Sequence, residues 1–262
     1  MRIIAHRGAS AEAPENTLAA FERALAAGAD MIELDVRLSA DGVPVVIHDE
    51  TLSRTTNGEG RVGDLSLEAL KELSAGGWFS ADFLEEKIPT LAEVYDLVGQ
   101  RAEINVEIKG EAARTGPASL GAVPDPGALA RTVFSSFNPR AIESVRNQSA
   151  PARLALLTGP ASVTNPDGGL PEDPEARVLA RVARWMPLGL EGANIHCGLA
   201  SAGLVRKLHA QNLRVYAYTV DGVSEVRKMA GLGVDGVFAN DPAPLLAHWP
   251  RAPHLDSGGS AA

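Results

Sequence analysis

Two carboxylates stand two positions apart in an otherwise apolar run near the amino terminus. The run reads Ile32-Glu33-Leu34-Asp35-Val36, which is typical of a β-strand. Because side chains alternate between the two faces of a strand, Glu33 and Asp35 project from the same face. Two like charges at that spacing repel each other, and a cation between them relieves the repulsion. The same pattern also fits a half-exposed strand whose acidic residues face water.

A second strand repeats this arrangement. Its polar residues are Glu103, Asn105, Glu107 and Lys109, and they alternate with Ile104, Val106 and Ile108. One possibility is an edge strand whose polar face is exposed to solvent. In a barrel, by contrast, polar residues near the carboxyl end of a strand reach the mouth of the active site. Glu33, Asp35 and Glu107 would then form an oxygen-rich site. Such a site suits Mg²⁺ or Ca²⁺ better than Zn²⁺, because no cysteine cluster or histidine pair at metal spacing accompanies it.

His6 and His48 both lie where an apolar strand meets a loop. A neutral imidazole accepts a proton from a nucleophile, and a protonated one gives a proton to a leaving alkoxide. A lone histidine at such a position is more often structural, but two beside the carboxylates favour a general acid/base pair. The remaining histidines carry no such prediction: His196, His209, His248 and His254.

Arg7 and Lys109 are the basic residues next to these groups. The forked donors of Arg7 match phosphate oxygens, and Lys109 supplies a point charge to the same group. We therefore predict that both bind phosphate. Arg7 could instead brace one of the carboxylates.

The elements that must position these residues alternate between strands and helices. We expect strands or apolar strand-like segments over residues 3–5, 31–38, 43–48, 102–109, 132–137, 154–157, 192–195, 213–220 and 234–239. We expect one helix that Asn16 caps and Gly28 ends, and further helices over residues 91–98, 202–210 and 223–230. This alternation favours a parallel β/α architecture, either a barrel or an open doubly wound sheet.

Three segments interrupt the alternation. About residues 50–89, after the strand that ends at His48, are too long for a simple connection and contain a helical stretch at 67–73, so we predict a small insertion over one end of the sheet. Residues 110–127 and 159–174 are rich in glycine and proline and are predicted to be long loops. The residues from 250 to 262 are predicted to form a flexible tail.

The bulk composition excludes several classes of protein. The 262 residues carry a net charge of -9, which argues against a nucleic-acid or anionic-membrane binder. Cys197 is the only cysteine, so the chain forms no intramolecular disulfide. The amino terminus has too short an apolar stretch for a signal peptide, and no run of about 18 apolar residues occurs, so we expect a cytoplasmic protein without stable membrane association.

Five short motifs occur in an order that resembles the glycerophosphodiester phosphodiesterase family. They are His6-Arg7-Gly8, Pro14-Glu15-Asn16-Thr17, Glu33-Leu34-Asp35-Val36, His48-Asp49 and Glu107-Ile108-Lys109. The likeness continues with Gly77-Trp78-Phe79, Ile88-Pro89-Thr90-Leu91, Tyr218-Thr219-Val220 and Gly236-Val237, and so spans nearly the whole chain.

The resemblance implies an α/β fold, a (β/α)8 TIM-type barrel forming one catalytic domain over residues 1–249. It implies release of sn-glycerol 3-phosphate and an alcohol such as choline or ethanolamine. By the same likeness, Glu33, Asp35 and Glu107 match metal ligands, His6 and His48 match the acid/base pair, and Arg7 and Lys109 match phosphate-binding positions. The family is thought to form a cyclic phosphate that water then opens, and direct attack by water stays open here.

The chain also departs from the family pattern. Tyr218-Thr219-Val220-Asp221 stands where the family often has Trp-Thr-Val-Asn. We expect Tyr218 to provide an aromatic wall for the substrate, while the preferred alcohol stays open. The stretch 110–136 looks poor in helix, so we expect one barrel helix to be short or missing.

Three other functions remain as alternatives. A phosphodiesterase of the same barrel type could cleave lysophospholipids or phosphoinositides, but it would need an exposed apolar surface. A barrel that has lost activity could serve as a binding protein. An aldolase could use Lys109 as a Schiff-base residue, but that chemistry needs no neighbouring cation. The choice between Mg²⁺ and Ca²⁺ and the oligomeric state are not decided by the sequence.

Overall fold

The computed structural model describes residues 1–164 and 173–249, and within them one nine-stranded sheet closes on itself. Strand β3 (Pro44–Val46) runs antiparallel to β2 and lies outside the ring. The other eight strands are parallel, and β1 pairs with both β2 and β9, which closes the barrel. These strands are β1 (Arg2–Ala5), β2 (Met31–Leu38), β4 (Glu103–Ile108), β5 (Thr132–Ser136), β6 (Arg153–Thr158), β7 (Gly192–His196), β8 (Arg214–Tyr218) and β9 (Gly236–Ala239).

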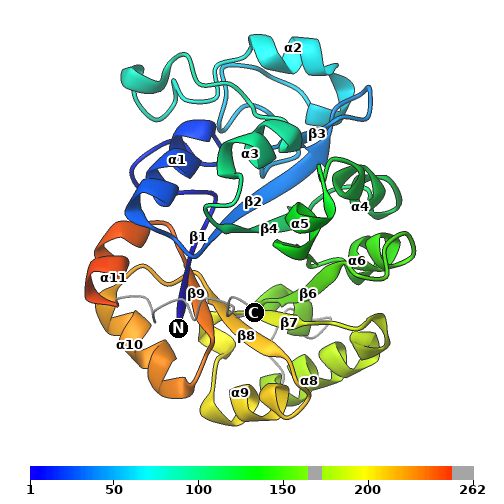
Figure 1. The fold of residues 1–262 in the computed structure, drawn as a ribbon, viewed down its shortest axis with the longest axis vertical. Coiled ribbons are helices and arrows are strands. Elements are labelled where there is room, and N and C mark those ends of the chain that lie inside the picture. Colours follow the sequence, from blue (N-terminus) through cyan, green and yellow to red (C-terminus); the bar gives the residue numbers. More distant parts are fainter. Residues whose placement is uncertain (165–172, 250–262) are drawn as a thin grey trace, which may run out of the picture.

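Helices surround the ring of strands on its outside (Figure 1). They are α1 (Leu18–Ala27), α3 (Leu91–Val98), α4 (Ala112–Gly121), α5 (Pro126–Ala130), α6 (Pro139–Arg146), α7 (Pro160–Val163), α8 (Pro174–Trp185), α9 (Ala202–His209), α10 (Val223–Leu232) and α11 (Pro242–His248). The helices predicted at 91–98, 202–210 and 223–230 correspond to α3, α9 and α10. The predicted (β/α)8 barrel is therefore confirmed, and the open doubly wound sheet is excluded.

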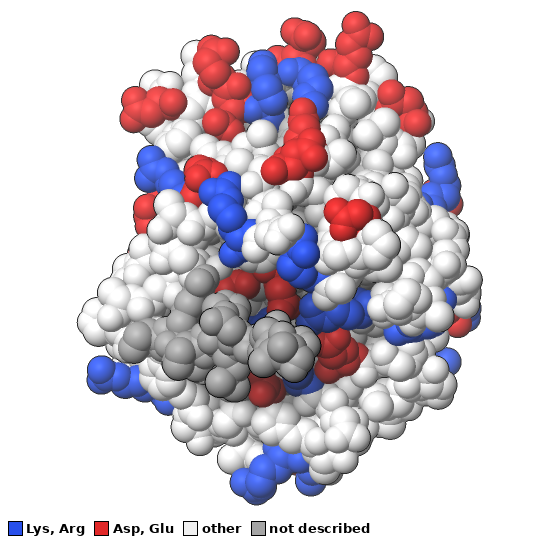
Figure 2. Space-filling view, in the orientation of Figure 1, with Lys and Arg blue, Asp and Glu red and all other residues white. Residues whose placement is uncertain are grey.

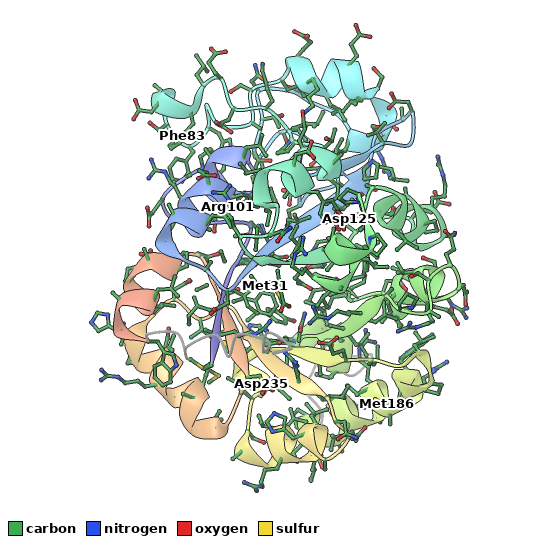
Figure 3. All side chains as sticks on the ribbon, viewed as in Figure 1. Met31, Phe83, Arg101, Asp125, Met186 and Asp235 are labelled. Carbon is green, nitrogen blue, oxygen red and sulfur yellow. The ribbon has the colours of Figure 1, made fainter. Side chains whose placement is uncertain are left out.

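The outer and inner faces of the barrel strands pack into two different apolar clusters. Outward-facing residues of β2, such as Ile32, Leu34 and Val36, pack into one apolar cluster with the helices. Inward-facing residues form a separate apolar layer made of Ile4, Met31, Val133, Ala155, Tyr216 and Phe238. Figure 3 shows Met31 near the centre of the ring. Polar groups at the carboxyl ends of the strands therefore rest on an apolar floor that keeps water from the lumen below them.

The chain between β3 and α3 packs a small apolar cluster of its own. We call residues 49–89 the insertion segment. It contains η1 (Val62–Asp64), α2 (Leu67–Glu72) and η2 (Ala81–Phe83), and α2 corresponds to the helix predicted at 67–73. The cluster comprises Val45, Ile47, Leu52, Val62, Leu70, Ala75 and Ile88. In Figure 1 this segment lies at the top of the molecule, beside α1 and α3.

The predicted cap of the first helix was wrong by one residue. Thr17 caps α1, with its hydroxyl accepting from the Ala20 backbone N–H at 3.3 Å. Asn16 instead adopts a left-handed conformation with φ 59°, which asparagine tolerates better than most residues. Its side chain turns toward β2 and becomes part of the site described below. Gly28 ends the helix as predicted, with φ 87°.

The loops predicted at 110–127 and 159–174 were also wrong in part. The first contains α4 and α5, so the barrel helix expected to be short or missing is present. Gly116 lies in α4 because a Cβ there would come within 2.3 Å of Ser144 on α6. The glycine thus serves close helix packing, which overrides its low helix propensity. The second contains α7, whereas residues 165–172 and the predicted tail 250–262 lie outside the described residues.

We predict that Gly8→Ala destabilises the fold more than Gly42→Ala. Both glycines have positive φ, 82° and 83°, so alanine strains the backbone at either position by about 1–2 kcal/mol. At Gly8 the added Cβ would also lie 2.7 Å from Ala20 on α1, whereas nothing lies within 4 Å at Gly42. This crowding adds about 1–3 kcal/mol. Denaturant unfolding of the two variants measures the difference, and equal losses would contradict the packing role of Gly8.

Candidate active site

A cavity of about 370 Å³ opens at the carboxyl ends of the barrel strands. Its polar side is lined by His6, Arg7, Glu33, His48, Asn105, Glu107 and Lys109, and its other side by Phe137, Leu157, His196, Tyr218, Thr219 and Phe238. Figure 2 shows acidic and basic side chains together near the middle of this face. The structure thus brings together every residue that the sequence predicted for the site, with Asp35 buried directly against the others.

The three predicted carboxylates converge from two neighbouring strands. Glu33 and Asp35 lie on β2 and Glu107 lies on β4, where Asp35 and Glu107 are register partners. Each offers one oxygen, and these oxygens all lie within 4.8 Å of one another. All three residues are buried, so the alternative of a half-exposed strand with acids facing water is excluded.

Burial and mutual repulsion change the ionisation of this cluster. Burial, with the charge of Asp35, raises the pKa of Glu33 to about 8. The same two causes raise the pKa of Glu107 to about 7. Burial also opposes ionisation of Asp35, but Lys109 and Arg7 outweigh it and hold the pKa of Asp35 well below its usual range. One member of the cluster is therefore firmly ionised, while Glu33 is mostly protonated at pH 7 and Glu107 titrates close to that pH.

The two predicted phosphate-binding residues contact these carboxylates. Lys109 Nζ lies 2.5 Å from Glu107 and 3.2 Å from Asp35. Arg7 Nε lies 3.3 Å from Asp35, and the Arg7 backbone N–H donates to Glu33 at 2.8 Å. Both cations therefore brace the acidic cluster and also line the cavity.

The cluster fits a hard divalent cation. Its donor atoms are carboxylate oxygens from Glu33, Asp35 and Glu107, the ligands that Mg²⁺ and Ca²⁺ prefer. Asp35 Oδ1 is buried and accepts no hydrogen bond, although Lys109 lies nearby. A buried carboxylate oxygen without a donor is costly unless a positive charge meets it.

Each of the two predicted histidines is held through one ring nitrogen. His6 Nδ1 lies 2.7 Å from the side-chain oxygen of Asn240, and His48 Nδ1 lies 2.6 Å from Asp49. Burial, with Arg7, lowers the pKa of His6, and burial, with Lys109 and Arg7, lowers that of His48. A neutral ring that donates from Nδ1 leaves its Nε2 lone pair available to a reacting group.

Aromatic rings form the opposite side of the cavity. Tyr218 packs edge to face against Phe137, His196 and Phe238, with ring centroids 6.0, 5.7 and 6.3 Å apart. The expected position of Tyr218 at a wall of the site is thus observed. The cavity therefore has an aromatic as well as a charged lining, and the two meet where Lys109 Nζ lies 5.9 Å from the centroid of the Phe137 ring.

Several residues of the site carried no predicted role. Asn16 donates to Asp35 at 2.9 Å and accepts from its backbone N–H at 3.2 Å. Glu15 accepts from Arg7 at 2.8 Å. Both belong to the Pro14-Glu15-Asn16-Thr17 motif, and its match to the family was the feature of the sequence that could have indicated a role in the site. No role was predicted for His196. Its position in β7, where it shares a face with Asn194, could have indicated that it faces the lumen.

Comparisons with known proteins agree with this geometry. Residues 6–243 match the Glycerophosphoryl diester phosphodiesterase family. A glycerophosphodiester phosphodiesterase from Caldanaerobacter subterraneus subsp. tengcongensis is 38% identical over 251 residues, covering 93% of this chain and 96% of that protein. One from Bacillus altitudinis is 36% identical over 247 residues, covering 92% and 95%.

Solved structures are similar over the same length. An Oleispira antarctica phosphodiesterase, in complex with the product sn-glycerol-3-phosphate, has a TM-score of 0.84 and 31% identity, covering 96% of this chain and 97% of that one. A glycerophosphodiester phosphodiesterase from Agrobacterium tumefaciens has a TM-score of 0.75 and 30% identity, covering 94% and 99%. The likeness therefore extends over both the barrel and the site.

We predict that the cation-free protein loses stability as the pH rises from about 6 to about 8.5. The folded state raises the pKa of Glu33 from 4.5 to about 8, so it binds a proton that the unfolded chain has released. The stability contributed by that proton is complete below the unfolded pKa and is lost as the pH rises through the folded value. Glu33→Gln carries no such proton, so its loss should be smaller by about 2 kcal/mol. Denaturant unfolding in chelator measures both proteins, and equal pH dependence would refute a raised pKa.

Proposed function

Because the chain belongs to the glycerophosphoryl diester phosphodiesterase family, we propose that it hydrolyses glycerophosphodiesters to sn-glycerol 3-phosphate and an alcohol with a divalent cation and two histidines. The chain is an enzyme of this activity class. One observation carries the finer proposal: three buried carboxylates with oxygens within 4.8 Å lie in the same cavity as two imidazoles. The product bound by the Oleispira antarctica relative supports the same product here.

Glu33, Asp35 and Glu107 would hold the cation, either Mg²⁺ or Ca²⁺. When bound, such a cation polarises a phosphoryl oxygen and offsets the repulsion between the carboxylates and an anionic substrate. Asn16 fixes the orientation of Asp35 with two hydrogen bonds. The ligand set is therefore oriented before substrate arrives.

Arg7 and Lys109 would bind the phosphate of the substrate. Both line the cavity and both are held by carboxylates, so their positions are set in advance. Arginine offers two parallel N–H donors to phosphate oxygens, and lysine offers a compact charge. Together they place the phosphorus within reach of the two histidines.

His6 and His48 would transfer the protons. One imidazole accepts at Nε2 the proton of the attacking oxygen, which is a substrate hydroxyl or water. The other takes up a proton at Nε2 from solvent to become the imidazolium and gives that proton to the leaving alkoxide, so the charge on the alcohol does not accumulate. The Nδ1 contacts with Asn240 and Asp49 hold both rings in a fixed orientation.

The aromatic side of the cavity would receive the apolar parts of the substrate. Tyr218 and Phe137 line the cavity there, with their rings packed edge to face. We propose that Tyr218 contacts the glycerol or the alcohol. Substitution of the tryptophan that is common in the family by Tyr218 would change the size of this subsite and so its choice of alcohol.

A small substrate fits this chain better than a lysolipid does. In the described part of the chain, the exposed large apolar side chains are Trp78, Leu84 and Phe137, too few for an extended lipid-binding surface. Within residues 1–164 and 173–249, each helix falls short of the length and apolarity that crossing a bilayer requires. We propose that the enzyme acts in the cytoplasm on free glycerophosphodiesters, without stable membrane association and without nucleic acid.

Removal of divalent cations is expected to abolish hydrolysis of glycerophosphocholine, and addition of Mg²⁺ or Ca²⁺ is expected to restore it. The acidic cluster alone repels an anionic phosphodiester, whereas the cation attracts it. The measurement is choline release in excess chelator and after cation titration. Glu33→Gln provides the control, because it should need more cation for half-maximal activity. Full activity in excess chelator would contradict the proposal.

His6→Ala and His48→Ala are each expected to lower kcat by about a hundredfold or more, the usual contribution of a general acid or base. His209→Ala is a matched control, since His209 lies on α9 and bonds Asp235 at 2.9 Å outside the cavity. Steady-state kinetics with circular dichroism to verify folding makes the comparison. Normal turnover by folded His6→Ala and His48→Ala would rule out the acid/base pair.

A further inference from the structure

Arg54 lies in the insertion segment and is not among the residues that line the cavity. Its guanidinium nevertheless hydrogen-bonds two carboxylates, those of Asp49 and Glu15. Arg54 Nε and Nη2 donate to Asp49 at 2.5 and 3.1 Å. Arg54 Nη1 and Nη2 donate to Glu15 at 2.8 Å each. The planar fork of one arginine therefore makes two bidentate contacts and joins the loop after β1 to the insertion segment.

Each of these carboxylates holds a residue of the proposed catalytic site. Asp49 contacts His48 Nδ1 at 2.6 Å, and Glu15 accepts from Arg7 Nη1 at 2.8 Å. A continuous chain of charged contacts therefore runs from His48 through Arg54 to Arg7. The proton-transfer group and the phosphate-binding group are linked through a residue that touches neither.

Other contacts hold the backbone in this region. The carbonyl of His48 accepts from Arg37 Nε at 2.8 Å, and the Val62 backbone N–H donates to the Glu50 carbonyl at 3.0 Å. Loss of the Arg54 side chain would therefore remove its hydrogen bonds to Asp49 and Glu15 without releasing the main chain on either side of Asp49. The expected consequence is a change in side-chain orientation.

Solvent exposure limits what Arg54 adds to stability. Its side chain is 44% exposed, compared with 13% for Glu15. Exposed ion pairs contribute about 0–1 kcal/mol to folding. By contrast, the partner of an imidazole Nδ1 sets the tautomer and direction of the ring, and for histidines that bind a metal the loss of such a partner typically costs about 10–100-fold in metal affinity or activity.

We propose that Arg54 is a positioning residue, which holds Asp49 and Glu15 so that the His48 imidazole and the Arg7 guanidinium keep the orientation needed for phosphodiester hydrolysis. This proposal rests on the functions proposed above for His48 and Arg7. Lysine cannot replace Arg54 fully, because an ammonium group lacks the planar fork that bonds two carboxylates at once.

Arg54→Ala is expected to lower kcat for glycerophosphocholine by about 10–100-fold and to raise KM, with Arg54→Lys between it and the wild type. Arg101→Ala is the matched control. Arg101 is 47% exposed and bonds Glu22 at 2.9 and 2.8 Å, and it lies near α1 and α3 in Figure 3. Wild-type kcat in folded Arg54→Ala would overturn the proposal. If Arg54→Ala does not fold, wild-type kcat in Arg54→Lys would overturn it instead.

A double-mutant cycle with His48→Ala separates positioning from a merely structural role. Arg54 is proposed to act on kcat through His48 and on KM through Arg7, so Arg54→Ala should lower kcat by no more than about twofold in the His48→Ala background while still raising KM. A full additional loss there would overturn the proposal while leaving the acid/base function of His48 intact. Normal turnover by His48→Ala alone would overturn the proposed function, and the role of Arg54 with it.

Discussion

The close approach of three carboxylates at the mouth of the barrel is the constraint on which the rest of the site depends. Glu33, Asp35 and Glu107 bring oxygens within 4.8 Å of one another, and burial removes the water that would otherwise screen their charges. Such a cluster persists only where protons or cations balance it. Arg7 and Lys109 supply part of the balance by direct contact. The raised pKa values of Glu33 and Glu107 mean that protons supply the rest when no divalent cation does.

The closed barrel holds the three carboxylates close together despite their repulsion. Asp35 and Glu107 face each other because β2 and β4 are in fixed register, and each strand is bonded on both sides within the ring. The backbone positions that carry the carboxylates therefore cannot separate without breaking several backbone hydrogen bonds at once. The apolar layer around Met31 lies beneath them in the lumen, and the open space beside them is the cavity that Glu33 and Glu107 line. The energy of repulsion is thus retained in the folded protein, where protonation or a cation relieves it.

The sequence predicted the strand-borne part of this site well and the loop-borne part poorly. Alternation along β2 and β4 predicted that Glu33 and Asp35 share one face and that Glu107 shares a face with Lys109, because a strand has only two faces, and a barrel then turns these faces inward. No such rule governs the loop after β1, so Asn16 was predicted to cap a helix and was found to hold Asp35 instead. The contact between Glu15 and Arg54 joins residues 39 positions apart through two irregular segments. Gly116 was interpreted as part of a loop. The reason for a glycine there is the close packing of α6 against α4, and residues 110–127 alone do not reveal that contact.

The same difference between strands and loops separates the carboxylates of the site from its histidines. The carboxylates lie within strands, so the barrel alone fixes their directions. His6 and His48 follow the last residues of β1 and β3, Ala5 and Val46, so their rings need partners from other segments. Asn240 and Asp49 are those partners, and Asp49 is held in turn from the insertion segment. The proposed cation binding and the proposed proton transfer therefore depend on different parts of the chain. Variation in the insertion segment can change the orientation of His48 while the three carboxylates stay as they are, since neither β2 nor β4 passes through it.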